Sequence, residues 1–322
     1  RRSSDLINVN NLIEMRRQGV TKLQLGVQSM DDHVLELNQR GHSARQAEDA
    51  VRLVRAAGYK VVVHWMPNLL GATPQSDRED FARLWRKGGI NPDELKIYPC
   101  QLLRNSELFV YWQRGEYKPY TEEALIDLLA DIKPTVPRFC RINRVIRDIP
   151  SNHVVEGNRN TSLRQDVALE MKQRGTVCQC IRCREIRKGK IDDKELVLDN
   201  LVYQAGWAEE HFLSYNTQDD HIVGFLRLSL PEKEHFFPVE ELRDAAIIRE
   251  VHVYGQSIEV GGEGGGSAQH RGLGSNLIEK AAEIARSRGY RKLTVISAVG
   301  TREYYAARGF ELGELYMVRE LR

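Results

Sequence analysis

The sequence predicts an α/β protein built from two different halves, on three observations. Up to about residue 150, strand patterns begin near residues 21, 60, 95 and 140, and helix patterns separate them. Such a βα repeat builds a parallel sheet, either open or barrel-like. From about residue 193, strand patterns over 196–207 and 221–230 follow each other without a helix, and a strand–glycine–helix segment comes next. The chain of 322 residues is long enough for two domains with a core each.

The helices of the first half carry start and stop signals. Asp31 and Asp32 can cap the helix that follows them. Ser43 and Gln46 form a capping-box pattern before apolar residues at helical spacing, and Gly58 ends that helix. The patterns then predict a strand over 60–65, a loop over 67–73, a helix over 76–87, a strand over 95–98 and helices over 106–113 and 121–132.

Several polar or aromatic residues follow or end the predicted strands, namely Gln28, Ser29, His64 and Tyr98. In parallel α/β folds, ligands bind at the carboxyl ends of the strands. A structural role fits each of these side chains equally well, since a lone histidine is more often a satisfied core residue.

The segment Gln-His-Arg-Gly-Leu-Gly over 269–274 organises the second half. An apolar strand over 245–254 precedes it, and a helix pattern over 275–288 follows it. This layout directs backbone N–H groups and the positive end of a helix dipole at one point, which suits a phosphate. Gly272 and Gly274 allow a phosphate close to the backbone because they lack a Cβ. A strand–helix connection without a ligand is the alternative interpretation.

The elements around this segment complete the second half. A strand over 292–297 and a short helix over 299–310 follow it. The connection over 255–268 is rich in glycine. We expect it to cover the pocket until RNA arrives, and a solvent loop without function fits equally well.

The composition is ordinary for a soluble protein, but the charge is unevenly spread. Apolar residues make up 41% and charged residues 29% of the chain, and the net charge is +2. Residues 134–190 hold 13 Lys or Arg and 5 Asp or Glu, a local charge of +8, so the remainder carries −6. A basic middle predicts a polyanion as partner. The alternative is a solvated surface with scattered counterions.

The number of cysteines and the start of the chain indicate the cellular compartment. The five cysteines are an odd number, and no signal peptide pattern opens the chain, so we expect a reducing cytoplasm. No run reaches the ~18 apolar residues of a membrane helix, so we expect no membrane association. The chain begins with Arg1 rather than Met, and we expect that upstream residues are absent from it.

Arginines dominate the basic middle. Arginine suits RNA because its guanidinium both grips phosphate and stacks on bases. We expect this region to bind RNA. The predicted RNA-binding residues are Arg138, Arg141, Arg144, Arg147, Arg159 and Arg164, and Lys172 and Arg174 continue the series.

Three cysteines within six residues predict a metal site. Cys178, Cys180 and Cys183 can converge on one ion, and Zn²⁺ takes thiolates readily. The fourth ligand stays open between Cys140, His153 and a water. We expect a structural role, and three surface cysteines without a metal are the alternative.

Longer motifs carry a resemblance to a known family. Q-x-x-G-x-G resembles the pyrophosphate loop of the GNAT acetyltransferases. I-S-A-V-G-T-R-x-Y-Y-x-x-x-G-F, R-E-V-H-V-Y-G and Q-H-R-G-L-G together resemble the acetyltransferase half of the catalytic subunit of Elongator. G-V-T-K-L-Q-L-G-V-Q-S-M-D-D, K-V-V-V-H-W-M-P-N-L and R-I-N-R-V-I-R-D-I-P are similar to its radical-SAM half. The resemblance covers nearly the whole chain, in the order of the family.

The resemblance implies a fold and its boundaries. We expect an incomplete radical-SAM (βα) partial TIM barrel over 1–150, a basic linker with the cysteine site over 151–192 and a GNAT-type α+β domain over 193–322. The family's iron–sulfur cluster needs three closely spaced cysteines near the N-terminus, and no such trio lies before Cys100. We therefore expect the [4Fe-4S] cluster and S-adenosylmethionine chemistry in the intact protein only.

The resemblance also implies an acetyl-CoA site. Tyr305 would lie near the thioester sulfur, where a hydroxyl can protonate or orient the leaving group, and Tyr304 is its neighbour. The residues expected along the pantetheine arm are Glu250, Val251, His252 and Val253. Those expected at the pyrophosphate are Gln269, Arg271, Gly272, Leu273, Gly274 and Ser275.

The implied activity is 5-carboxymethylation of wobble uridine 34 in tRNA with acetyl-CoA. The partners would be tRNA, whose anticodon stem-loop the basic middle of the chain would hold, with further Elongator subunits in a eukaryote or none otherwise. Two other functions stay open. One is a protein lysine acetyltransferase with Glu250 as general base. The other is a tRNA-binding scaffold whose acetyl-CoA site only regulates.

Overall fold

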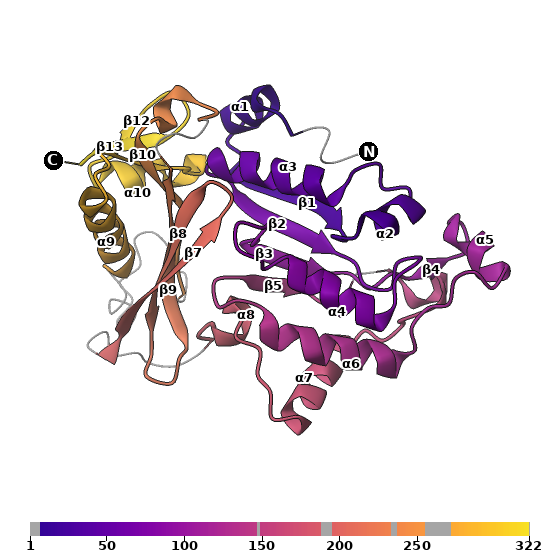
Figure 1. Ribbon diagram of the computed structural model, residues 1–322. Coiled ribbons are helices and arrows are strands. Elements are labelled where there is room, and N and C mark those ends of the chain that lie inside the picture. The colour runs from indigo at the N-terminus through magenta and orange to yellow at the C-terminus, as the bar shows by residue number, and fades with distance from the viewer. Residues whose placement is uncertain (1–6, 147–148, 188–194, 233–236, 255–271, 322) are drawn as a thin grey trace. The chain divides into compact units, whose positions relative to one another are not determined.

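The computed structural model describes residues 7–146, 149–187, 195–232, 237–254 and 272–321 (Figure 1). Four features predicted from the sequence lie outside them, namely Arg147, the connection over 255–268, Gln269 and Arg271. The chain divides into two compact units. The first unit contains Gln24–Val51 and Val61–Cys183, and the second contains Ile7–Leu23, Arg52–Lys60 and Arg184–Arg322.

The first unit is built on a four-stranded sheet of order β1-β2-β3-β5. Its strands are β1 (Lys22–Gln28), β2 (Lys60–Trp65), β3 (Glu94–Ile97) and β5 (Arg141–Arg144). The pairs β2–β3 and β3–β5 are parallel. At the two ends of β1, the carbonyls of Thr21 and Gln28 accept from the amides of Lys60 and Met66, so β1 and β2 run the same way. The parallel sheet predicted from the βα repeat is confirmed.

Helices alternate with these strands, as the repeat requires. Asp31 caps α2 through bonds from the amides of His33 and Val34, and the Ser43–Gln46 capping box is present in both directions. The helices are α2 (Asp32–Leu37), α3 (Ala44–Ala56), α4 (Pro74–Arg83), α5 (Leu108–Gln113), α6 (Glu122–Ile132), α7 (Leu163–Gln173) and α8 (Ile181–Arg184). A short antiparallel pair, β4 (Leu102–Leu103) and β6 (Val154–Glu156), lies outside the main sheet.

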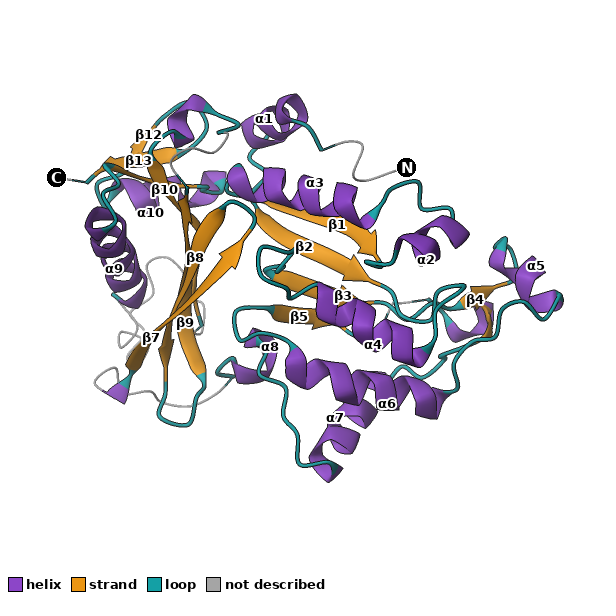
Figure 2. Cartoon of the chain, viewed as in Figure 1, coloured by secondary structure: helices purple, strands orange, loops and turns teal. Residues whose placement is uncertain are grey.

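The two faces of the parallel sheet differ. Figure 2 shows α3, α4 and α6 running over one face. Val61, Val63 and Trp65 of β2 are fully buried, whereas His64 between them is half-buried. On the face of His64, the amide oxygen of Gln24 accepts from Lys96 Nζ at 2.7 Å. That face of the sheet thus carries the polar side chains of Gln24, His64 and Lys96 beside the buried Val62.

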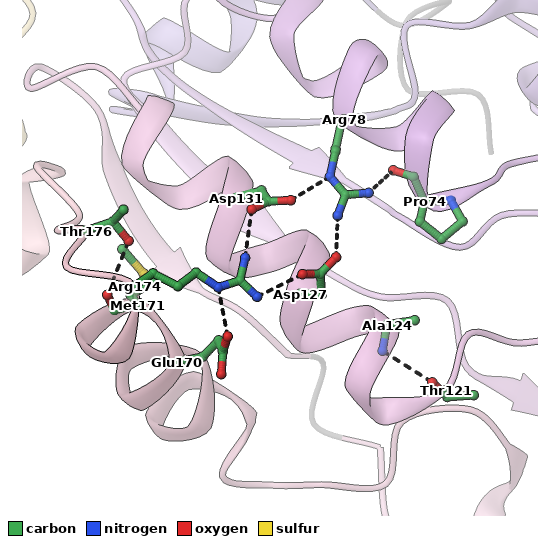
Figure 3. Close-up of polar contacts among 10 residues, drawn as sticks. All are labelled: Pro74, Arg78, Thr121, Ala124, Asp127, Asp131, Glu170, Met171, Arg174 and Thr176. Carbon is green, nitrogen blue, oxygen red and sulfur yellow. Dashed lines mark hydrogen bonds and ion pairs between the residues drawn. The ribbon is translucent and has the colours of Figure 1, made fainter.

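An ion-pair network joins three helices of the first unit (Figure 3). Asp127 and Asp131 of α6 each contact Arg78 of α4, at 2.5 and 2.7 Å, and each contact Arg174 at 2.8 Å. Arg174 also contacts Glu170 of α7 at 2.7 Å. Partly exposed pairs contribute about 0.2–1 kcal/mol each, so their main effect is to fix how the helices pack. Because carboxylates bind all three of its guanidinium nitrogens, Arg174 is a poor candidate for RNA binding.

The second unit has a seven-stranded sheet of order β12-β13-β11-β10-β9-β8-β7. Helix α9 packs across β8, β9 and β10, and its apolar face, including Leu277, Ile278 and Ala281, is fully buried. The strands are β7 (Val197–Ala205), β8 (Ala208–Asn216), β9 (Ile222–Pro231), β10 (Ala245–Val253), β11 (Lys292–Val295), β12 (Glu311–Leu312) and β13 (Met317–Glu320). The helices are α1 (Val9–Arg17), α9 (Leu273–Ser287) and α10 (Arg302–Ala306).

The sequence analysis missed β8. It predicted strands over 196–207 and 221–230, on the two sides of β8, and a turn over residues 217–221 joins β8 to β9. The strand begins Ala-Glu-Glu-His, which reads as a solvent-exposed segment. In the fold, Glu210 is fully buried because its carboxylate binds Arg249 Nη2 at 2.7 Å, and Arg249 is itself fully buried. A partner 39 residues away in the sequence hides the strand from a local pattern.

Buried arginines also tie the N-terminal segments into the second unit. Arg16 of α1 donates to the carbonyls of Leu315 and Ser297, at 2.8 and 2.6 Å. Arg249 Nη1 donates to the carbonyl of Tyr59 at 3.3 Å. Residues from the first part of the chain thus belong to the second unit and are bonded to its loops and to β10. Within the described residues, no helix combines the length and the apolar character that crossing a membrane requires.

Candidate functional site

The candidate cofactor site begins at strand β10. Its pairing with β9 continues to Val253, with a bulge between Ile248 and Glu250. Its parallel pairing with β11 covers only residues 245–248 in the described part of the sheet. Residues 250–253 therefore keep one backbone edge that these ladders do not use. Such an edge can pair with an extended chain like the pantetheine arm of acetyl-CoA.

Glu250 is held by two cations. Its carboxylate contacts Lys60 Nζ at 2.5 Å and Arg227 Nε at 2.9 Å, and its side chain is 13% exposed. A carboxylate that accepts from two cations is poorly placed to take a proton from a substrate amine. This geometry favours a positioning role at the β10 bulge over the general-base role.

The start of α9 forms a cradle in which two glycines, Gly272 and Gly274, flank the buried Leu273. Gly272 caps the helix with a φ of 133°, a conformation that favours glycine. Leu273 is buried beside Val223 and Val253. A Cβ added at Gly274 would collide with Oη of Tyr304. The unpaired N–H groups of this turn and the helix dipole favour an anion at this place.

A tyrosine and an arginine from α10 and its end lie against this turn. The Arg308 guanidinium carbon lies 3.5 Å from the centre of the Tyr304 ring. Arg308 Nε donates to Ser275 Oγ at 2.9 Å, and Nη1 donates to the carbonyl of Tyr304 at 2.6 Å. A fixed positive charge thus lies beside the predicted phosphate site.

Tyr305 has a different environment from Tyr304. Its ring is 7% exposed and packs edge-on against Tyr304 and Phe310. Burial, and then the neighbouring Tyr304, raise the pKa of its hydroxyl above the ordinary value of 10.0. The hydroxyl therefore stays protonated at neutral pH, as a proton donor to a thiolate must. Its assignment to the thioester sulfur stays a prediction.

The three cysteines of the candidate metal site converge. The sulfurs of Cys178, Cys180 and Cys183 lie within 4.8 Å of one another. Three thiolates of a tetrahedral zinc site, each about 2.3 Å from the ion, would require such spacing. The hydrogen bond from Cys178 lowers the pKa of Cys180, and the same bond raises the pKa of Cys178. The residues fit a soft cation, and neither Cys140 nor His153 belongs to this group among the described residues.

The predicted RNA-binding arginines are not in one environment. Arg144 and Arg159 are exposed, and Arg138 and Arg141 are half-buried. Arg164 Nη2 donates to the carbonyl of Ile142 at 3.0 Å, and burial lowers its pKa. The charges of the cysteine group act on Arg164, so this arginine lies beside the candidate metal site.

Comparisons with known proteins agree with this architecture. The Radical SAM superfamily matches residues 3–84, the Radical SAM C-terminal domain matches 92–173, and the acetyltransferase (GNAT) family matches 184–310. The chain is 39% identical over 311 residues to the tRNA uridine(34) acetyltransferase of Dehalococcoides mccartyi, covering 94% of this chain and 67% of that protein. The chain belongs to the family of tRNA uridine(34) acetyltransferases and Elongator complex protein 3.

Two further members of this family show how far the likeness extends. Elongator complex protein 3 of Danio rerio is 39% identical over 320 residues, which cover 97% of this chain and 58% of that protein. A solved structure of the archaeal Methanocaldococcus infernus Elp3 with an N-terminal deletion (1–46) matches with a TM-score of 0.90 and 34% identity. The match covers 99% of this chain and 76% of that one. The chain spans roughly three fifths to two thirds of the length of these curated relatives. The fold class predicted from sequence, radical-SAM domains followed by a GNAT domain, is confirmed.

Sequence reasoning missed two features of this family member's cofactor site. It did not identify Arg308, whose side chain reaches Ser275 across 33 positions of sequence. It also did not connect Glu250 with Lys60, 190 positions earlier. For Arg308, the only local signal was a charged residue at the end of a short helix after the glycine loop. Such residues are common on protein surfaces.

Proposed function

We propose that this chain is the larger part of an acyltransferase that modifies wobble uridine 34 of tRNA with acetyl-CoA. Relatives that carry the name tRNA uridine(34) acetyltransferase support this reaction. For the complete protein we propose 5-carboxymethylation, with S-adenosylmethionine and a [4Fe-4S] cluster. The cluster does not fit this chain, because its sequence offers no three closely spaced cysteines before Cys100. No radical step is therefore assigned to the residues of this chain.

The cradle of Gly272 and Gly274 beside the open edge of β10 carries the acetyl-CoA proposal. A Cβ at Gly274 would meet the Tyr304 hydroxyl and come within 3.7 Å of the Val253 side chain. Val253 also packs with Leu273, so the open edge of β10 ends beside the glycine turn. The acyl chemistry then comes from the thioester. This chain's residues bind the diphosphate at Leu273, Gly274 and Ser275, orient the pantetheine on β10, and hold a proton on Tyr305.

The metal, the RNA surface, the boundaries and the location are further proposals. We propose Zn²⁺ at Cys178, Cys180 and Cys183, supported by the spacing of the three sulfurs. We propose Arg138, Arg141, Arg144, Arg147, Arg159 and Arg164 for RNA and keep the domain boundaries near residues 150 and 192. A cytoplasmic location would suit five cysteines that form no disulfide. Other Elongator subunits are proposed as partners for a eukaryotic complete protein.

The experiment measures acetyl-CoA hydrolysis by the chain with tRNA, with a histone peptide, and with neither. Stimulation by tRNA alone supports the proposal. Acetyl transfer to the peptide would support the lysine acetyltransferase instead, although the two cations on Glu250 argue against it. Saturable acetyl-CoA binding without turnover in any arm would leave the tRNA-binding scaffold.

A further inference from the structure

A groove of the first unit lies beside the β4–β6 pair, and Arg159 is the one residue of its described lining that the functions above already use. It encloses about 830 Å³ and is open on one side. The two strands pair antiparallel through Leu102 with Glu156 and Leu103 with Val154. The lining residues are Leu103, Arg104 and Asn105 from the first strand and the turn after it, and Ile149, Asn152, His153, Val154, Val155 and Arg159 from the second strand and its flanks.

The groove has an apolar floor and a cationic rim. Val154 is buried, and Leu103 and Val155 are half-buried. Arg104, His153 and Arg159 are exposed at its sides, together with two asparagines. No Asp or Glu is among the described residues that line it. Arginine and histidine side chains on which bases can stack, amides for the base edges and guanidinium groups for phosphate are elements of single-stranded RNA recognition.

The groove is backed by a packed aromatic cluster, which keeps its floor in place. Val155 packs with Phe109, Tyr111 and Trp112 of α5 around the buried Leu102 and Tyr117. The nearby carboxylate of Glu156 accepts from the indole N–H of Trp112. The acidic group closest in sequence is therefore bound to the aromatic cluster. On the rim, the Arg159 guanidinium donates to the carbonyl of Val155.

We propose that this groove binds single-stranded RNA, with phosphates on Arg104 and Arg159 and a base on Leu103. The inference rests on the proposed function, because an anticodon loop supplies unpaired nucleotides on either side of the modified uridine. It adds Arg104, Asn105, Asn152 and His153 to the RNA-binding residues, and it predicts that the loop rather than the stem occupies this surface.

The test compares the wild-type chain with the double variant Arg104→Ala/Arg159→Ala by fluorescence anisotropy over a series of salt concentrations. The probes are an anticodon stem-loop RNA and a blunt duplex with the sequence of the stem. Binding of the stem-loop should weaken at least tenfold. The slope of log affinity against log salt should become shallower by about 0.7 for each phosphate that the variant no longer binds, about 1.4 in all. Duplex binding should be unchanged.

Arg45→Ala is the matched control, since Arg45 is 81% exposed and does not line the groove. It should leave both affinities unchanged, and the melting temperature and acetyl-CoA affinity should be the same in all variants. Unchanged stem-loop affinity and slope in the double variant would overturn the inference, as would an equal loss for stem-loop and duplex. An acidic peptide that binds the wild-type groove more tightly than the stem-loop would overturn it too. A wild-type chain that binds no tRNA would instead overturn the proposed function.

Discussion

The proposed cofactor cradle of the second unit and the proposed RNA groove of the first unit would recognise anions in opposite ways. At the cradle, backbone groups and glycines present the site, and buried ion pairs such as Glu210–Arg249 hold the strand beside it. At the groove, exposed arginines present the charge. A fixed site loses little entropy on binding, whereas exposed side chains must be ordered and are screened by salt. Substitutions that disturb the cradle should therefore lower both the stability of the fold and the affinity for the ligand. Substitutions in the groove should change only the affinity for RNA and its salt dependence.

The largest effect is expected from Glu210→Gln. Both Glu210 and Arg249 are fully buried, and the variant leaves the arginine charge without its carboxylate. Removing one partner of a buried pair costs about 3–5 kcal/mol of the free energy of unfolding. Urea denaturation followed by a probe in the second unit measures this loss.

Glu209→Gln is its matched control. Glu209 is 24% exposed and contacts Arg288 at 2.7 Å and His211 at 3.0 Å. Its loss should cost less than about 1 kcal/mol, because solvent screens the pair. Equal losses for the two variants would remove the buried pair from the account of how β10 is held.

A smaller effect is expected from Arg308→Leu. The charge beside Ser275 would be removed, and acetyl-CoA affinity should fall roughly fivefold, or about 1 kcal/mol. Arg308→Lys should retain part of the affinity, since it keeps the charge but not the guanidinium. Titration with dephospho-acetyl-CoA, which lacks the 3′-phosphate, shows which phosphate Arg308 binds. If the variant still loses affinity for this ligand, Arg308 contacts the diphosphate; if the loss disappears, Arg308 contacts the 3′-phosphate. If the variant binds acetyl-CoA and dephospho-acetyl-CoA as tightly as the wild type does while its melting temperature falls, Arg308 only supports the fold.

The smallest effect concerns the pH dependence of the first unit. Asp77 accepts from the amide of Asn68 and the hydroxyl of Tyr120, both at 2.8 Å, and burial raises its pKa from 3.8 to about 7. Because the folded pKa is the higher one, its stabilising contribution is full below 3.8 and is lost as pH rises to about 7. Asp77→Asn should therefore gain melting temperature relative to the wild type over this range.

Asp127→Asn provides a control of opposite sign. The hydrogen bond from Arg174 lowers the pKa of Asp127, so its contribution is present at neutral pH and is lost in acid. This variant should be slightly less stable than the wild type at pH 7, and the difference should disappear as the pH falls. The same trend in both variants would exclude Asp77 as the source of the pH dependence.

The sequence predicted what depends on near neighbours. The capping box of Ser43 and Gln46 and the strand over 60–65 follow from a few adjacent residues. The three cysteines also converge as their spacing indicates. The sequence could not predict pairings across long separations, such as Lys60 with Glu250 or Glu210 with Arg249. These pairings hide β8 behind a polar pattern and explain why Glu250 looked like a general base.

Binding of acetyl-CoA to Gly274→Ala tests the central claim most directly. The matched control is Gly300→Ala, because an added Cβ at Gly300 meets nothing within 4 Å. Equilibrium dialysis should find one saturable site per chain in the wild type and in Gly300→Ala. Gly274→Ala should bind at least tenfold more weakly, a loss of about 1.4 kcal/mol. No saturable site in the wild-type chain, or equal affinity in Gly274→Ala, would contradict the account.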